Sequence, residues 1–206
     1  PTGAPLWGPS ALTLFDNGSL HGPYPTMVSD GGGGVVVTWE DATMPEQCRV
    51  QRVLASGQKA FAHNGVNVTT DNSNRHVNPA ATFDATTGRT TVFWHNSNPA
   101  SPGLHGQQLD SSGARLWGPE GGHYPHSIPG AADITIGPTP NGLMIFWSSP
   151  HTGLMGTHVD SSGIVDIPTF SVGSPFPAYN SLLLTRSTSG FSILTWKRGH
   201  VAAQNV

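Results

Sequence analysis

Four copies of one short apolar run, each ending in tryptophan, constrain the fold of this chain more than any other feature. The runs are VVVTW, TTVFW, LMIFW and SILTW, which end at Trp39, Trp94, Trp147 and Trp196. Successive tryptophans are 55, 53 and 49 residues apart. A period of this length, with one apolar strand per repeat, is typical of a propeller-type array whose repeats bury their faces against their neighbours.

The second repeat shows what one unit contains. Strands are expected at Ala80–Phe83, Thr90–Trp94 and Leu104–Leu109, and a fourth is expected to start at Ala114–Trp117. Tight turns such as DSSG at Asp110–Gly113 separate them, because glycine tolerates positive φ and aspartate caps its own turn. The pattern predicts four antiparallel strands per blade.

The two ends of the chain carry complementary parts of one repeat. LWGP at Leu116–Pro119 recurs at Leu6–Pro9, and AAQNV at Ala202–Val206 matches GQQL at Gly106–Leu109. We therefore expect an all-β, four-bladed β-propeller over residues 1–206, with the last blade closed by the N-terminal strand. The blades are expected at about residues 22–70, 75–120, 124–172 and 177–206 plus 1–13. Four blades cut from a longer propeller are the alternative.

Composition narrows the partners. Charged residues are 10% of the chain and the net charge is −3, which disfavours a nucleic-acid partner. No apolar stretch is long enough for a membrane helix, so no membrane partner is expected. The single cysteine, Cys48, excludes an internal disulfide and is expected to be a buried, inert thiol. The first residue is Pro1 and not Met, so a cleaved export signal and a secreted or periplasmic location are expected.

The repeats also resemble a known group of proteins. QQLDSSGARLWGPEGG, together with VVVTWED, is similar to repeats of bacterial secreted β-propellers, whose blades carry a W-E-D strand end and a Q-x-x-D-x-x-G turn. The resemblance covers nearly the whole chain and rests on structural motifs. It implies a propeller fold and an exported protein, and it implies no catalytic residues.

Seven of the ten histidines are expected on one face of the propeller. Loops between blades carry His21, His76, His123 and His126, and loops after the tryptophan strands carry His95, His151 and His200. Converging imidazoles bind transition metals or exchange protons near neutral pH. We expect His21, His76 and His126 to be candidate ligands of a divalent transition metal, and His151, His200 and Tyr179 to contact a ligand. No HExxH or CxxC motif is present, and loop histidines held by hydrogen bonds are the alternative.

The residues that follow the tryptophans differ chemically, although the tryptophans do not. They are Glu40, His95, Ser148 and Lys197. Alternation along a strand puts each one on the face opposite its tryptophan. An acid, an imidazole, a hydroxyl and an amine at one ring position indicate an asymmetric site. Glu40 or His95 would be the general base, Lys197 or Arg198 would stabilise an anion, and Asp41 and Ser148 would contact the ligand. Salt bridges at the rim are the alternative.

Two further features have structural interpretations. The four repeated tryptophans are expected to pack between blades and not to present sugar-binding surfaces. Asp133 lies in an expected inner strand, AADITI, where it would either bond exposed backbone or bind a cation in the channel.

Two functions fit these patterns. The first is a small extracytoplasmic enzyme with a His-rich pocket, which performs acid–base or metal-assisted hydrolysis or elimination on a polar small molecule or saccharide. The second is a lectin-like or protein-binding module without catalysis. Binding at one site per blade predicts the same polar residues in each repeat, whereas Glu40, His95, Ser148 and Lys197 differ, and this difference favours the enzyme. The oligomeric state is not indicated.

Overall fold

Every regular element in the structure is a β-strand. The computed structural model describes residues 7–8, 11–124, 133–149, 153–173, 179–186 and 192–198. No helix that could span a membrane occurs in these ranges. The strands are β1 (Leu20–Ser29), β2 (Val35–Asp41), β3 (Gln47–Val53), β4 (Val66–Asn67), β5 (His76–Asp84), β6 (Arg89–Asn96), β7 (Gly103–Leu109), β8 (Gly122–Tyr124), β9 (Ile134–Thr139), β10 (Gly142–Ser149), β11 (Gly153–Asp160), β12 (Val165–Gly173), β13 (Tyr179–Arg186) and β14 (Ser192–Arg198).

These strands form antiparallel sheets in which chain neighbours pair. Sheet A is β1-β2-β3-β4, sheet B is β5-β6-β7-β8, sheet C is β9-β10-β11-β12 and sheet D is β13-β14. The four tryptophan runs are β2, β6, β10 and β14, the second strand of each sheet. The prediction of an all-β chain with repeated four-stranded antiparallel sheets is therefore confirmed for sheets A, B and C.

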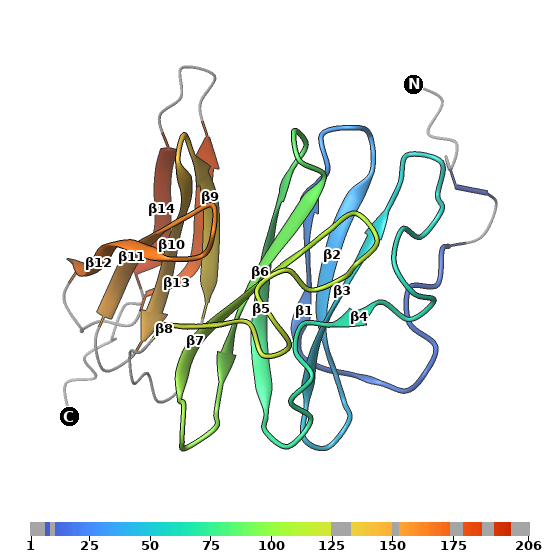
Figure 1. Ribbon diagram of the computed structural model, residues 1–206, viewed down its shortest axis with the longest axis horizontal. Coiled ribbons are helices and arrows are strands. Elements are labelled where there is room, and N and C mark those ends of the chain that lie inside the picture. The colour runs from blue at the N-terminus through green and yellow to red at the C-terminus, as the bar shows by residue number, and fades with distance from the viewer. Residues whose placement is uncertain are drawn as a thin grey trace, which may run out of the picture.

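The sheets pack on one another in chain order (Figure 1). The first strands make successive contacts, since β1 touches β5, β5 touches β9 and β9 touches β13. Strands of each sheet also reach the first strand of the next, as β2 and β3 reach β5 and β10 reaches β13. Each sheet is thus covered by its successor, which is how a repeat that cannot bury its own faces becomes stable.

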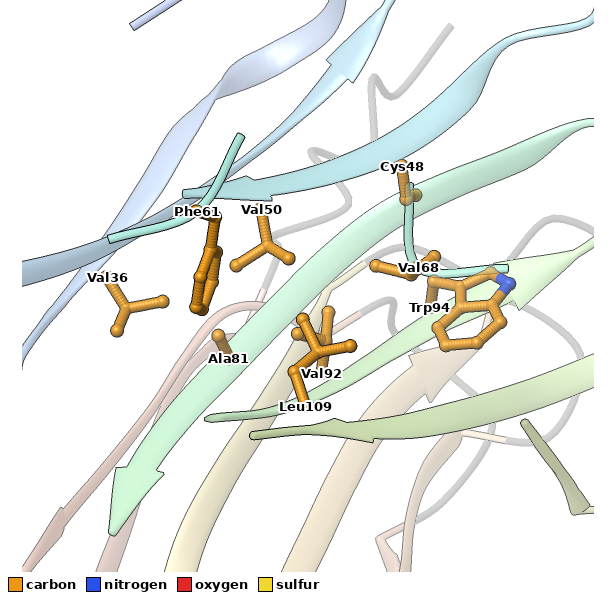
Figure 2. Packing of buried hydrophobic residues seen from close by; sticks show 9 residues of the cluster. All are labelled: Val36, Cys48, Val50, Phe61, Val68, Ala81, Val92, Trp94 and Leu109. Carbon is orange, nitrogen blue, oxygen red and sulfur yellow. The ribbon is translucent and has the colours of Figure 1, made fainter. Parts of the chain in front are cut away.

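An apolar layer fills the space between sheets A and B (Figure 2). Val36 and Val50 of sheet A face Val92 and Trp94 of sheet B, and all four are completely buried. Cys48 belongs to this layer, and burial, with Glu40 and Asp41 nearby, raises the pKa of its thiol well above the usual value. The expected burial of this thiol is confirmed.

A second apolar layer lies between sheets B and C. Phe93 and Leu104 of sheet B pack with Ile145 and Trp147 of sheet C. Trp94 and Trp147 therefore each face the preceding sheet, and their side chains are completely buried. Trp39 is 3% exposed and its ring centroid lies 5.9 Å from that of Phe15. Trp94 and Trp147 thus pack between sheets, as predicted, whereas Trp39 packs against Phe15, and the side chain of Trp196 lies outside what the structure describes.

The fourth strand of the second repeat differs from the prediction. The segment Ala114–Trp117 makes only one bridge to the third strand, between Arg115 and Leu109. The strand itself is β8, at Gly122–Tyr124, and it pairs with the other end of β7. The LWGP motif has a different role, because its aromatic ring packs on a glycine turn of the following repeat.

This aromatic–glycine contact recurs along the chain. A Cβ placed on Gly163 would lie 2.8 Å from the ring of Trp117, and one on Gly113 would lie 3.0 Å from the ring of Phe61. At Gly57 the ring belongs to Trp7, 3.1 Å from such a Cβ, and the Trp7 indole N–H donates to the carbonyl of Ala55 at 3.0 Å. The N-terminal segment thus contributes to sheet A the contact that Phe61 contributes to sheet B.

Candidate functional site

Three of the residues that follow the tryptophans are buried, and of the fourth, Lys197, only the backbone is described. Glu40 shares a strand face with Val36 and points toward sheet B, and His95 shares a face with Phe93 and points toward sheet C. Glu40 is 3% exposed, His95 is 5% exposed and Ser148 is 1% exposed. Glu40 and His95 occupy different inter-sheet layers, so the structure does not bring them together on one rim.

Glu40 accepts a backbone hydrogen bond from one strand and lies close against a glycine of another. Its Oε1 accepts the backbone N–H of Asn78 at 2.7 Å, across the layer between sheets A and B. Asn78 has φ of 55° and lies where the β5–β6 register shifts between Val77 and Ala80. On the other side, a Cβ on Gly22 would lie 2.5 Å from Glu40 Oε2. A β-bulge and a glycine therefore make room for this carboxylate and fix it.

His21 lies between two carboxylates. Its Nδ1 is 3.5 Å from Glu40 Oε2, and its Nε2 is 3.5 Å from Glu46 Oε1. Arg75 holds the other oxygen of Glu46, with 3.0 Å between Nε and Oε2. The side chain of His21 is 44% exposed, whereas those of Glu40 and Glu46 are 3% and 11% exposed. An accessible imidazole is thus backed by two fixed acids.

Asp41, the next residue along the chain, has protein partners of its own. Its carboxylate is completely buried and accepts hydrogen bonds from Arg49 Nε and from the hydroxyl of Thr43. Because both oxygens are occupied within sheet A and its loop, the carboxylate is positioned to hold the β2–β3 connection.

His76 begins β5 and is 1% exposed. Its Nδ1 lies 2.9 Å from Gln47 Oε1, and its Nε2 lies 3.9 Å from Asp71 Oδ2. Burial lowers the pKa of His76 to about 4, even though Asp71 favours the charged form. The imidazole is therefore neutral at physiological pH.

A row of rings crosses sheet B from His76. The centroids of His76 and Trp94 are 6.1 Å apart, those of Trp94 and His105 are 5.9 Å apart, and His105 stacks on His123 at 4.7 Å. His105 Nε2 lies 2.9 Å from the carbonyl oxygen of Ser101, and burial is the main cause of its lowered pKa. His76 and His123 lie in strands, where loops were expected, and they pack within the sheet.

His95 is the least satisfied polar side chain among the expected site residues. Both ring nitrogens are buried without a hydrogen-bond partner, and burial, with His105 nearby, lowers its pKa to about 3. Ser148 Oγ is likewise buried without a partner, whereas the Ser148 backbone N–H donates to the carbonyl of Asp133 at 3.1 Å. Asp133 precedes β9, so its carbonyl extends the pairing with β10.

Several expected site residues lie beyond what the structure describes. His126, His151 and His200 are outside the described ranges. Tyr179 pairs with Arg198 and Asn180 pairs with Lys197 across β13 and β14, and only the backbone of these four residues is described. Within the described part of the chain, no group of three or more His, Cys, Asp or Glu residues is arranged to hold a metal ion.

Two residues of the group around His21 were missed by sequence reasoning. Glu46 and Arg75 precede β3 and β5, and they meet because the backbone N–H of His76 donates to the Glu46 carbonyl at 2.9 Å. The available signal was the charged residue just before each of these strands. It is weak in a sequence, since such positions are also ordinary loop positions.

No family model, curated protein or solved structure matches this chain.

Proposed function

We propose that this chain is a small extracytoplasmic enzyme that transfers protons at His21, in hydrolysis or elimination on a polar small molecule or saccharide. The observation that supports it is the exposed imidazole of His21, with a carboxylate oxygen 3.5 Å from each ring nitrogen. An imidazole can both donate and accept a proton, which suits it to general acid–base catalysis.

Each residue of the cluster has a distinct part in this proposal. Glu40, fixed by the Asn78 N–H, orients the ring through Nδ1. Nε2 is the acid–base position, where a proton goes to the leaving group or returns from attacking water. Glu46, held by Arg75, pairs with the Nε2–H of His21 when no substrate is bound. Lys197 and Arg198 of β14 are the candidate groups for stabilising an anion.

The proposal is tested by activity in matched variants. Nitrophenyl esters and nitrophenyl glycosides would be incubated with wild-type protein and with His21→Asn, and His63→Asn would be the control because His63 is exposed and distant in sequence. We expect turnover that falls about a hundredfold in His21→Asn, in line with loss of a general acid–base group, with an unchanged melting temperature. Turnover retained in His21→Asn, or absent for every compound, would count against the enzyme and favour the binding module.

The metal-assisted form of the proposal concerns His21, His76 and His126. Elemental analysis of the purified protein, before and after chelator treatment, tests it. Stoichiometric metal that depends on His21 and His126 would support this form, and no binding on addition of Zn²⁺ would end it.

We also propose that sheets A to D close into a four-bladed propeller. The supporting contact is that of Trp7, which packs on the Gly57 turn of sheet A as the ring of a preceding repeat would. A closed, compact chain of 206 residues should have a radius of gyration of about 17 Å. Small-angle X-ray scattering would measure it, and a clearly larger value for the monomer would argue for an open array.

A further inference from the structure

A groove opens between sheets B and C at the end of the sheets away from His21. Its volume is about 820 Å³, within the range of small-molecule sites. The β5–β6 turn forms one wall, and the β9–β10 turn forms the other. Asp84 and Thr86 lie on the first wall, and Pro138 and Asn141 lie on the second.

The equivalent place between sheets A and B is filled. There the Arg52 guanidinium lies 4.3 Å from the centroid of the Phe83 ring. Arg52 is opposite Val36, which is completely buried in the apolar layer. Asp30 holds the guanidinium from the side, with 3.0 Å between Oδ2 and Arg52 Nη2.

Three replacements at matching register positions open the groove. Thr91 and Val36 each lie three residues before a tryptophan, and Gln108 opposes Thr91 as Arg52 opposes Val36. Pro138 takes the place of Phe83, because each pairs with the residue four positions before its own tryptophan. The space between sheets A and B therefore holds a valine, an arginine and a phenylalanine. At the matching positions, the space between sheets B and C holds Thr91, Gln108 and Pro138, and all three line the groove.

The floor of the groove is polar and nearly buried. Thr91 is 4% exposed and Gln108 is 9% exposed. Gln108 Nε2 donates to Thr91 Oγ1 at 3.3 Å, and Gln108 Oε1 accepts from Arg89 Nη1 at 3.1 Å. One carboxamide hydrogen and the threonine hydroxyl hydrogen remain to be donated to a ligand.

The walls complement this floor. Carboxylates of Asp84 and Asp160 lie on two turns, and the hydrogen bond from Thr87, the largest contribution, keeps the pKa of Asp84 below its usual value. Carboxylates and carboxamides exchange hydrogen bonds with hydroxyl groups, and the Pro138 and Pro140 rings offer C–H surface.

From this geometry we propose that the groove between sheets B and C binds a neutral or amino saccharide, at a site separate from His21. The negative charge of the two aspartates disfavours acidic sugars and phosphates. The site lies between two particular sheets and owes its shape to residues that have no counterpart in the space between sheets A and B, so it does not require one site per blade.

Filling the groove tests the proposal directly. Maltohexaose, cellohexaose and chitohexaose would be titrated into wild-type protein by calorimetry. The double variant Gln108→Arg, Pro138→Phe copies the contact between sheets A and B, and Gln58→Arg adds the same charge on an exposed turn. We expect at least one saccharide to bind wild type and Gln58→Arg with a dissociation constant below about 1 mM, and the filled variant to bind at least about tenfold more weakly.

Two further variants complete the design. Thr91→Val removes the floor hydroxyl without filling space, and it should also weaken binding if the double variant does not fold. His63→Asn, which changes an exposed residue outside both sites, should bind saccharide as the wild type does. Binding of none of the three saccharides, or binding that survives both the filled variant and Thr91→Val, would overturn the proposal.

Discussion

Replacing His95 with leucine should stabilise the protein at neutral pH. The side chain is 5% exposed and neither ring nitrogen has a hydrogen-bond partner. A buried polar group without a partner costs about 1–3 kcal/mol. Leucine has a similar volume and no polar atoms, so His95→Leu should raise the free energy of unfolding at pH 7 by about 2 kcal/mol.

The same variant should weaken the dependence of stability on acid. The folded-state pKa of His95 is about 3 and the ordinary value is 6.5, so between these pH values the unfolded chain binds a proton that the folded chain does not. The contribution of the neutral His95 imidazole to the free energy of unfolding is complete above pH 6.5 and is lost progressively as the pH falls toward 3. At pH 5 the loss is about 1.5 × 1.36, or about 2 kcal/mol, and His76, with a pKa of about 4, contributes a similar amount.

Urea unfolding at pH 7 and pH 5 measures both effects. Because of these two histidines, the free energy of unfolding of the wild type should fall by about 4 kcal/mol from pH 7 to pH 5. That of His95→Leu should fall by about 2 kcal/mol. His63→Leu, which removes an exposed histidine, should follow the wild type. If His95→Leu is less stable than wild type at pH 7, or keeps the whole acid-dependent loss, the account of His95 as an unpaired buried imidazole is refuted.

Two substitutions test the backbone contacts that position the carboxylates. Gly22→Ala would place a Cβ 2.5 Å from Glu40 Oε2 at a φ of +75°. It should lower the free energy of unfolding by about 2 kcal/mol and the melting temperature by about 4–8 °C. The control Gly32→Ala meets only ordinary contacts and should change stability little. Asp30→Ala removes the acceptor of two backbone N–H groups and of Arg52, so the urea midpoint should fall by the equivalent of about 3 kcal/mol. Asp30→Asn keeps an oxygen that caps the turn and should lose less stability. Equal losses in the two variants would contradict this reasoning.

The sequence predicts the repeating strands well because their signal is local. Alternating apolar residues and a terminal tryptophan are sufficient to locate β2, β6 and β10, and burial of Trp94 and Trp147 follows from their regular spacing. The fourth strand is harder. Leu116–Pro119 repeats as clearly as the strands do, yet it repeats because Trp117 packs on the next turn, and a repeat shows that a residue matters without showing which contact it makes.

The candidate site needed information that a sequence does not carry. Strand alternation correctly separates Glu40 from its neighbouring tryptophan, but it does not show that this face is covered by the next sheet. The bulge at Asn78 depends on tertiary packing, and so does the meeting of His21 with Glu46. Polarity alone does not indicate exposure here, because Glu40 and His95 are buried.

The ring-on-glycine contact also gives the array a direction. In sheets A, B and C a glycine turn receives an aromatic ring from earlier in the chain: Trp7 at Gly57, Phe61 at Gly113 and Trp117 at Gly163. A row of such repeats in which the first glycine turn had no ring against it would accept the ring of another molecule. Head-to-tail contacts that do not close produce filaments. The ring of Trp7 packs on the Gly57 turn from within the same chain. The N-terminal segment therefore occupies, from within the chain, the place on sheet A where the ring of another molecule would pack.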